Sequence, residues 1–508
     1  METDLVQRLQ RQEPRLVSAI NDIAQTVANH PANPAYPDTK PSAWVVGGFV
    51  RDLLLGLQPK DADIEVFGVS PEDLTKIVTD LFGDHVDAVG ESFGVLKVFL
   101  GDGFEIDVAL PRRESKAGRG HKGFLIDSDP GLSPIDAGKR RDFTVNAISF
   151  NPVSGELFDP FDGVKDLEAK ILRVVDATHF VEDPLRVYRA IQFSARFHLT
   201  PDVHSFALMK NMVAEGALEE LSVERVTDEI RKLLLKAPQP SVGFNLAREL
   251  GVVAKYYPEL EVLKHTPQEP EWHPEGDVWI HTMMVIDAAA TIIRRDAHLF
   301  TDEERLWVML GALCHDLGKP ATTAPGEKHG VPRLRSLGHE AAGKEPAMAL
   351  ISKWAFGSAA EQAAIAIATQ HMLPFDHWKR FEEHSITKDQ YINAIRKLIR
   401  RIYPTPWRVY LAATEADRRG RLFPNVDTEP YEPGILFSET VERYGLEEQA
   451  KTTLIQGRDI MTMAKSLGVS IKPGKRFGEI IEKIEAMRDQ GIIKTKEEGL
   501  EKLKEILK

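Results

Sequence analysis

Acidic residues alternate along one short apolar segment of the chain. Asp61, Asp63 and Glu65 are separated from one another by single apolar residues. Since successive side chains of a strand point to opposite faces, the three acids are expected on one face of a β-strand. Like charges on one face repel, and a divalent cation would offset that repulsion. Mg²⁺ prefers oxygen ligands, so Asp61 and Asp63 are candidate metal ligands and catalytic residues for phosphoryl transfer.

A pair of glycines stands upstream of these acids. Gly47 and Gly48 follow an apolar run and precede a helical pattern. In such an arrangement backbone N–H groups can approach an anion at a helix N-terminus. Asp107, in a later β-rich run, could complete the acidic set. An edge strand that carries charges against aggregation would show the same Asp-x-Asp spacing. The glycine pair favours a metal site beside a phosphate site instead.

These residues resemble the signature of the nucleotidyltransferase superfamily, in its branch of class II tRNA nucleotidyltransferases and bacterial poly(A) polymerases. The matching segments are Gly47–Asp52 and Lys60–Asp63. Further motifs follow in the family's order, namely a basic loop at 112–122, Arg-Arg-Asp-x-x-x-Asn-Ala at 140–147 and Glu-Asp-x-x-Arg at 182–186. The resemblance implies nucleotide binding by Gly48, Arg51, Arg141, Asp142, Asn146, Asp183, Arg186 and Arg189.

Two of these residues have a spacing that could read a base. Asp183 and Arg186 are three residues apart, so they share a face of a helix. Cytosine and adenine both present an exocyclic amine beside a ring acceptor, which a carboxylate and a guanidinium complement. Uracil and guanine present the opposite order and would leave buried groups unpaired. A simpler explanation, compatible with the first, is that Asp183 caps a helix whose first residue is Pro184.

A second group of candidate ligands lies beyond residue 270. Histidines and aspartates on helices can bind a metal ion that activates water for phosphoester hydrolysis. The order of these residues resembles that of the HD phosphohydrolase domain. The resemblance implies a divalent metal ion, of undetermined identity, held by His281, His315, Asp316 and Asp417. A second ion could be held by His339 and His371. Such a site can also persist as a scaffold without turnover.

Short β-rich runs must position the first site. Strands are expected at 43–46, 61–67, 95–100, 104–110 and 147–150. Helices are expected at 49–55 and 71–82, and Gly101–Gly103 predicts a hairpin turn. Residues 4–29 have the pattern of one amphipathic helix, and the prolines that follow it predict a stiff linker.

After residue 165 the apolar spacing is that of helices. The predicted fold class is therefore an α/β head, a small mixed-sheet nucleotidyltransferase palm, followed by a mostly α-helical neck, body and tail. The predicted parts are an N-terminal helix and linker at 1–41, the head at 42–165, a base-recognition neck at 166–240, an HD body at 241–425 and a tRNA-contacting tail at 426–508.

Composition sets outer limits on the function. The chain has 508 residues, a net charge of −13 and one cysteine, Cys314, which suits a reducing cytosol. No uninterrupted apolar run reaches membrane-spanning length. The acidic average argues weakly against a nucleic-acid partner, but basic clusters at 112–122, 139–141 and 396–401 offset it locally.

We therefore expect a class II CCA-adding tRNA nucleotidyltransferase that carries an HD domain. It would extend tRNA from CTP and ATP with Mg²⁺ in the cytoplasm, with no membrane and no obligate protein partner. Three alternatives stay open: a poly(A) polymerase, an enzyme that adds only CC or only A, and an HD phosphohydrolase whose head senses nucleotides. The complete basic loop at 112–122 argues against a CC-only enzyme, and intact Asp61 and Asp63 argue against an inactive head.

Overall fold

The computed structural model of the chain divides into two compact units. The head unit comprises Met1–Glu229 with Glu249–Gly251, and the body unit comprises Ile230–Arg248 with Val252–Lys508. The structure describes residues 2–89, 95–116, 124–489, 491–493 and 495–508. Most of the predicted neck is thus grouped with the head, while the predicted domain boundaries themselves stay predictions. None of the described helices combines the length and apolar character that crossing a membrane requires.

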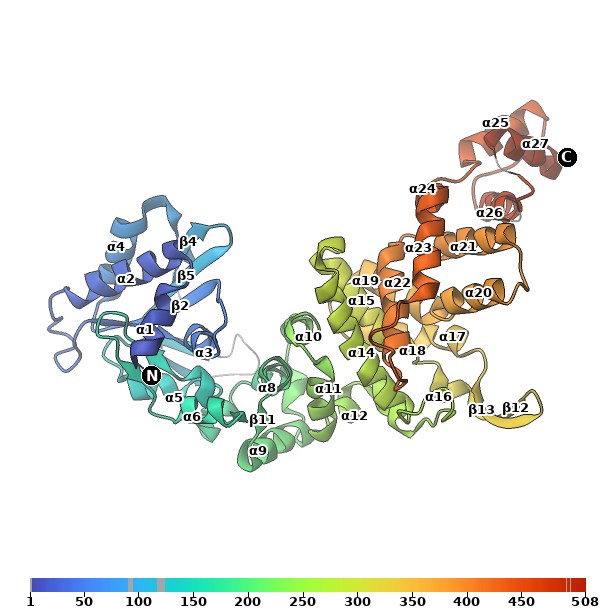
Figure 1. Cartoon of the computed structure of the whole chain (residues 1–508). Coiled ribbons are helices and arrows are strands. Elements are labelled where there is room, and N and C mark those ends of the chain that lie inside the picture. The colour runs from blue at the N-terminus through green and yellow to red at the C-terminus, as the bar shows by residue number, and fades with distance from the viewer. Residues whose placement is uncertain (1, 90–94, 117–123, 490, 494) are drawn as a thin grey trace. The chain divides into compact units, whose positions relative to one another are not determined.

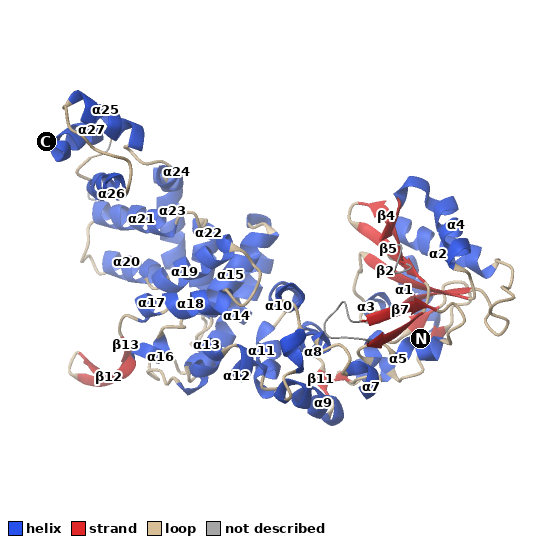
Figure 2. Cartoon of the chain, turned by 180° about the vertical axis from the view of Figure 1, so that it is seen from behind, coloured by secondary structure: helices blue, strands red, loops and turns tan. Residues whose placement is uncertain are grey.

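A seven-stranded mixed sheet forms the centre of the head unit (Figure 2). The strand order is β3-β4-β5-β2-β1-β8-β9, with β2 and β5 parallel and the other neighbours antiparallel. The mixed sheet predicted from the sequence is confirmed. The strands are β1 (Ser42–Val46), β2 (Asp61–Phe67), β3 (Val86–Val89), β4 (Val95–Gly101), β5 (Phe104–Ala109), β8 (Ser149–Phe150) and β9 (Leu157–Phe158).

The predicted strand at 147–150 is shorter than expected. Only β8 is extended, because Thr144–Asn146 forms a turn of 3₁₀ helix just before it. The first five residues of the predicted basic loop at 112–122 form strand β6 (Arg112–Lys116), which pairs antiparallel with β7 (Phe124–Ser128). Residues 117–122 of that loop lie outside the described residues.

Two helices follow the strands that carry the site. Helix α3 (Gly48–Leu54) follows β1, and α4 (Pro71–Phe82) follows β2. Ser70 caps α4, since its side chain accepts the N–H of Asp73 and a proline occupies the first turn.

The first 28 residues form two helices, α1 (Glu2–Gln10) and α2 (Pro14–Ala28), instead of the single predicted helix. Pro14 suits a first turn but not a helix interior, which explains the break. Figure 1 shows α2 and α4 on the same side of β4 and β5. The α2 residues that join the core of the sheet include Leu16, Ile20, Ile23 and Val27. This N-terminal segment therefore belongs to the core of the head.

The rest of the head unit is mostly helical. Helix α8 (Leu185–Phe197) carries Arg186 and Arg189, and Asp183 lies just before it. The other helices are α5 (Pro134–Lys139), α6 (Gly163–Glu168), α7 (Ala177–Phe180), α9 (Val203–Ala214) and α10 (Val223–Lys236), whose last turns enter the body unit. Two short strands, β10 (Ile171–Leu172) and β11 (Thr200–Pro201), pair parallel.

Four helices pack against one another at the centre of the body unit: α14 (Val278–Arg295), α15 (Asp302–Cys314), α19 (Ser358–Gln370) and α22 (Trp407–Arg419). Around them lie α11 (Pro240–Glu249), α12 (Val252–Tyr256), α13 (Pro258–Glu261), α16 (Lys319–Thr322), α17 (His339–Ala342), α18 (Lys344–Ile351), α20 (Leu373–Glu382), α21 (Lys388–Ile402), α23 (Glu432–Tyr444) and α24 (Leu446–Lys451). A separate small core joins α25 (Gly457–Ser466), α26 (Lys475–Asp489) and α27 (Lys496–Leu507).

One element of the body unit departs from the helical expectation. Strands β12 (Thr323–Lys328) and β13 (Val331–Ser336) form an antiparallel hairpin that projects from the helices (Figure 2). Its turn is made by His329 and Gly330, both with positive φ. This hairpin therefore interrupts the helical segment between the predicted metal ligands Asp316 and His339.

Candidate active site and metal centre

The acids of β2 lie opposite further acids on the neighbouring strand. In the parallel pairing of β2 with β5, Asp63 stands across from Asp107 and Asp61 across from Glu105. Nζ of Lys97 lies 2.7 Å from Asp107 and 3.0 Å from Glu105. The structure thus places Asp107 beside the predicted metal ligands, with a lysine as its present partner.

Desolvation and like charges disfavour ionisation of Asp63. Its pKa is raised, first because the surrounding protein displaces part of the water around the carboxyl, although the residue keeps an exposed surface, and then because Asp107 and Asp61 are close; Arg141 acts in the opposite direction. A bound cation would reverse this balance and stabilise the carboxylate. The residues present therefore fit a metal ion at this position.

Gly47 is the glycine that the backbone requires. Its φ of +72° lies in the region that L side chains rarely adopt. A Cβ there would stand 2.9 Å from Nη1 of Arg141 and 3.7 Å from Oδ2 of Asp63. Gly48, the first residue of α3, lies beside the guanidinium of Arg51. The tight turn therefore brings a guanidinium and a metal-site carboxylate against the backbone, a setting suited to phosphates.

Four of the predicted nucleotide-binding residues form one hydrogen-bond network. Arg51 donates to Oδ1 of Asn146 at 2.5 Å, and Nδ2 of Asn146 donates to Asp142 at 2.9 Å. Nε of Arg189 donates to the other oxygen of Asp142 at 2.7 Å. Burial alone would raise the pKa of Asp142, but Arg189 and the bond from Asn146 lower it overall. This network braces the floor of the site, and direct nucleotide contacts by its members stay a prediction.

The carboxylate of Asp183 has two partners at the start of α8. The helix begins at Leu185, one residue later than expected, and Asp183 still accepts the N–H of Leu185 at 3.2 Å. The carboxylate also accepts Nη2 of Arg225, at 2.9 Å for the closer oxygen. Asp183 is therefore not the N-cap that was predicted, because Pro184 occupies that position, but its carboxylate accepts the first N–H of α8 and forms an ion pair that orients it.

Arg186 is held by backbone carbonyls. Its Nη1 donates to the carbonyl of His179 at 2.9 Å, and its Nη2 donates to the carbonyl of Arg140. A base that contacted this guanidinium would have to share or replace these bonds.

Three consecutive residues connect the acids of β2 to α8. Arg140 forms an ion pair with Glu65 of β2 and offers its carbonyl to Arg186 of α8. Arg141 lies 3.5 Å from the same Glu65 and is the guanidinium next to Gly47. Asp142 binds Arg189 of α8, as described above. Ion pairs and hydrogen bonds therefore link β2, which carries the predicted metal ligands, to α8, which carries Arg186 and Arg189.

Helices of the body unit bring the second set of predicted ligands together. Nε2 of His281 lies 3.2 Å from Nε2 of His315 and 3.1 Å from Oδ1 of Asp417. Nε2 of His315 lies 3.1 Å from Oδ2 of Asp316. All four residues are buried, and they come from α14, the end of α15 and α22.

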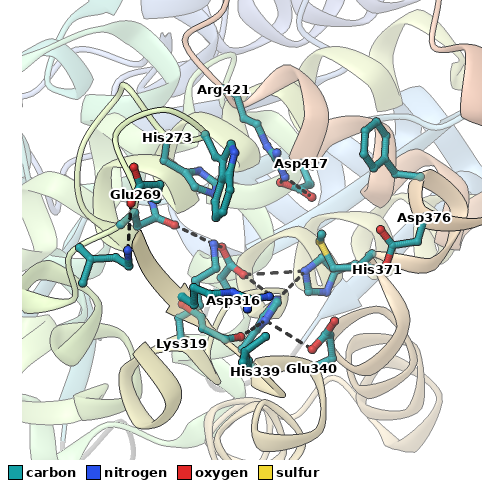
Figure 3. A pocket seen from close by; sticks show the side chains of 18 of the residues that line it. Glu269, His273, Asp316, Lys319, His339, Glu340, His371, Asp376, Asp417 and Arg421 are labelled. Carbon is teal, nitrogen blue, oxygen red and sulfur yellow. Dashed lines mark hydrogen bonds and ion pairs between the residues drawn. The ribbon is translucent and has the colours of Figure 1, made fainter. Parts of the chain in front are cut away.

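A second group adjoins the first through Asp316. Nε2 of His339 lies 3.3 Å from Nε2 of His371, and these atoms are 3.6 and 3.8 Å from Oδ1 of Asp316. Figure 3 shows Asp316 between Lys319 and this pair of histidines. The two oxygens of one carboxylate thus face two groups of imidazoles, each large enough to hold a metal ion.

The outer nitrogen of each ring is occupied. Nδ1 of His315, His339 and His371 lies 2.8, 2.8 and 3.1 Å from the backbone carbonyl three residues earlier. Nδ1 of His281 lies 2.9 Å from the carboxylate of Glu275. The carbonyls only accept, so Nδ1 of His315, His339 and His371 carries the proton, and in the neutral rings Nε2 turns a lone pair inward. Lone pairs that face each other at such distances repel, whereas a cation between them would be bound by both.

The charges around this centre keep its carboxylates ionised. Burial alone would raise the pKa of Asp316, but His315 and Lys319 hold it well below its usual value. Burial likewise opposes ionisation of Asp417, and Arg421 with the histidines outweighs it. Burial lowers the pKa of His315 less than Asp316 and Asp417 raise it. A proton and a metal ion therefore compete for the same atoms, and metal binding should release protons.

A cavity of about 550 Å³ opens onto the centre and is lined in part by Asp316, His339, His371 and Asp417. Its cationic lining consists of Lys319, Lys328, Arg335, Lys379, Arg418 and Arg421. Its aromatic lining consists of Trp272, Phe375 and Phe423. Cations beside a metal centre suit a phosphate, and aromatic rings suit a base.

Several residues that hold these sites together carried little signal in the sequence. Lys319 and Arg421 follow Asp316 and Asp417 by three and four residues, so helical spacing could have suggested them. Arg225 reaches Asp183 from a distant helix, and no local pattern predicts that pairing.

Three family models match the chain in order. They are the Poly A polymerase head domain over residues 43–173, the probable RNA and SrmB-binding site of polymerase A over 197–263, and the HD domain over 278–395.

Relatives and solved structures agree with these models. The multifunctional CCA protein of Stenotrophomonas maltophilia K279a is 36% identical over 82% of this chain and 93% of its own length. That of Pasteurella multocida Pm70 is 35% identical over 76% and 85%. A solved CCA-adding enzyme with CTP is 20% identical over 99% and 97% of the two chains, with a TM-score of 0.56. The Thermotoga maritima CCA-adding enzyme complexed with tRNA is 19% identical over 99% and 98%, with a TM-score of 0.52. These two structures share the fold of the chain.

Proposed function

The chain belongs to the family of multifunctional CCA proteins, and we propose that it adds C, C and A to the 3′ end of tRNA from CTP and ATP. The observation that carries this function is the set of contacts by which Arg140–Asp142 join Glu65 of β2 to Arg186 and Arg189 of α8. Chemistry and base choice can then act on one nucleotide. Since tRNA, CTP and ATP are its substrates, we place its work in the cytoplasm.

Asp61 and Asp63 would hold Mg²⁺, which when bound neutralises triphosphate charge and makes a hydroxyl a better nucleophile. Arg141, beside Gly47 and Asp63, is placed to meet the phosphates with its planar fork. The 3′-hydroxyl of tRNA attacks the α-phosphate of the nucleotide, and pyrophosphate leaves. The tight turn at Gly47 leaves room for the phosphates because no side chain projects there.

Selection of C and A rests on Asp183 and Arg186. The carboxylate would accept from the exocyclic amine, and the guanidinium would donate to the ring nitrogen. Arg225 supports this role because its ion pair fixes the carboxylate while leaving an acceptor lone pair for the base. Arg189 is fixed by Asp142 and extends the same face of α8 toward the nucleotide.

The body unit supports a second, hydrolytic activity on phosphate esters. His281, His315, Asp316 and Asp417 would hold one divalent ion, and Asp316, His339 and His371 a second. When bound, such ions supply an activated water and charge neutralisation at phosphorus. Imidazole and carboxylate donors suit a transition metal such as Mn²⁺ or Ni²⁺. Lys319, Arg418 and Arg421 would hold the phosphate in the cavity.

One incubation separates this function from its rivals. The purified full chain is mixed with tRNA that ends at the discriminator base and with each labelled nucleotide, alone and together, and product ends are sequenced. CCA addition gives C-C from CTP alone and C-C-A from CTP with ATP. Long A tracts would indicate a poly(A) polymerase, and termination at C-C with both nucleotides a partial enzyme. No incorporation would indicate a nucleotide-sensing head and contradict the proposal.

A further inference from the structure

His273 and Glu275 precede α14 and have no role in the function described so far. Oε1 of Glu275 lies 2.9 Å from Nδ1 of His273 and 2.9 Å from Nδ1 of His281. The side chain of Glu275 is only 1% exposed, and its second oxygen accepts the N–H of Leu422 at 3.3 Å. One buried carboxylate therefore holds two imidazoles and also fixes the chain that follows Asp417.

The two imidazoles face different surroundings. Their rings meet edge to face with centroids 4.7 Å apart. His281 is fully buried and turns Nε2 toward His315 and Asp417, whereas His273 lines the cavity. Figure 3 shows His273 on the side of the cavity that Arg421 occupies. Glu275 thus directs one ring to the metal centre and the other to the space where a substrate would lie.

The hydrogen-bonding capacity of His273 follows from its partner. Glu275 can only accept, so Nδ1 of His273 carries the proton and Nε2 is an acceptor. Among the described residues, Nε2 makes no hydrogen bond. Lys319 and Arg421 line the same cavity, so a further positive charge on this ring would be unfavourable. In the neutral ring the acceptor Nε2 cannot bind a phosphate oxygen, which also accepts, but it can bind a hydroxyl group.

We propose that His273 is a substrate-contacting residue whose Nε2 accepts a hydrogen bond from the ribose hydroxyl next to the scissile phosphate, and that Glu275 is the positioning residue for His273 and His281. The cavity volume of about 550 Å³ accommodates a nucleotide. The cationic lining takes the phosphate, which leaves the acceptor for the sugar. This assignment rests on the hydrolytic function proposed for the body unit.

The test compares two substrates that differ in a single hydroxyl, adenosine 3′-monophosphate and 2′-deoxyadenosine 3′-monophosphate, with the Mn²⁺-loaded full chain. The wild type should prefer the ribonucleotide. His273→Ala should lower kcat/KM for the ribonucleotide about ten-fold and leave the deoxynucleotide unchanged, because only the hydroxyl loses a partner. His273→Gln keeps an acceptor and should restore part of the preference. His298→Ala, at an exposed histidine of the same unit, is the matched control.

Metal affinity separates the two roles without any turnover. Calorimetry should show unchanged Mn²⁺ binding for His273→Ala. For Glu275→Ala the dissociation constant should rise about 10- to 100-fold, because the ring of His281 loses the carboxylate that lies 2.9 Å from its Nδ1. Weaker Mn²⁺ binding by His273→Ala would make His273 a metal ligand and overturn the assignment. Equal losses for both substrates would assign His273 to the reacting water or to folding, and would overturn it as well.

A failure of hydrolysis is distinguishable from a failure of this inference. If the wild type cleaves neither substrate, the proposed hydrolytic function is wrong. Equilibrium binding of the same two nucleotides then tests the contact with His273. Nucleotide binding that remains in His315→Ala is assigned to the head unit and is subtracted from the binding measured for the wild type and for His273→Ala. A preference for the ribonucleotide that disappears in His273→Ala would support the contact, and equal binding of the two nucleotides would overturn it.

Discussion

The head unit and the body unit both rely on aspartates, but they surround them differently. In the head, desolvation and neighbouring acids raise the pKa of Asp63, and Asp107 relies on a single lysine. In the body, the pKa values of Asp316 and Asp417 lie well below the usual range because histidine, lysine and arginine side chains surround them. The protein therefore supplies the countercharge in the body, whereas the head leaves a deficit of positive charge.

This difference fits the work of each site. A site that takes up a new metal-bound triphosphate in each cycle is suited by acids without a permanent countercharge, because the incoming metal ion neutralises them. A site that retains its metal ions gains from donors that are already oriented, as the bonds to the Nδ1 atoms show. On the proposed functions, aspartates in the head would bind a cation that arrives with each nucleotide, and aspartates in the body would bind a cation that stays. The side chains around each aspartate account for the difference.

The largest expected effect comes from removing a head aspartate. Asp63→Ala should lower nucleotide addition about a thousand-fold or more, because the metal ion loses a ligand beside the phosphates. Hydrolysis by the body unit should be unchanged. Incorporation of labelled CMP into tRNA measures the first activity, and release of phosphate measures the second. Asp84→Ala, at an exposed acid of the head unit, is the control, and addition that survives in Asp63→Ala would refute the metal assignment.

The reciprocal change removes a resident ligand. His315→Ala should weaken metal binding by at least about a hundred-fold and abolish hydrolysis, since both groups of donors meet at neighbouring atoms. Addition of CCA should persist. Metal content after dialysis and CMP incorporation are the two measurements. Loss of both activities would mean that the metal ion holds the whole chain together, and the contrast between the two sites would then be wrong.

A smaller effect should appear in base choice. Asp183→Ala should reduce the preference for CTP over UTP about 10- to 100-fold, because the exocyclic amine loses its acceptor. The ratio of kcat/KM values for the four nucleotides measures this. Asp84→Ala, at the exposed acid of the head unit, again serves as the control. Wild-type selectivity in Asp183→Ala would exclude the pairing hypothesis.

The smallest effects concern stability, and their signs should differ between two aspartates of the head. The raised pKa of Asp63 means that its stabilising contribution is present below about pH 3.9 and is lost as pH rises through the folded-state pKa. Asp63→Asn should therefore raise the metal-free stability at pH 7.

Asp142 should behave in the opposite way. Its pKa is lowered, so its contribution is present above about pH 3.9 and is lost as pH falls through the folded-state pKa. Asp142→Asn should lower stability at pH 7 and flatten the acid side of the profile. The free energy of unfolding, measured with denaturant and a metal chelator from about pH 3 to about pH 8, checks both variants. If both variants changed the stability at pH 7 in the same direction, the predicted difference between Asp63 and Asp142 would be wrong.

Features that depend on a few neighbouring residues could be predicted from the sequence. Alternation predicted that Asp61 and Asp63 share one face of β2, as they do, whereas Asp183 lies before α8 and only Arg186 is in the helix. The predicted fold class, with its mixed sheet and helical remainder, is confirmed for the same reason. Local geometry has a period that residues at fixed spacing reveal without knowledge of the rest of the chain.

Contacts between residues that are distant in the sequence could be identified only from the tertiary structure. The pairing of Asp183 with Arg225, the sharing of Glu275 between two imidazoles, and the packing of α2 on the sheet all join residues from separate elements. Many arginines could neutralise a given carboxylate, and many apolar helices could cover a given sheet. Local periodicity cannot rank these partners, because the choice depends on how the chain returns in space and on which arrangement leaves the fewest buried charges unpaired.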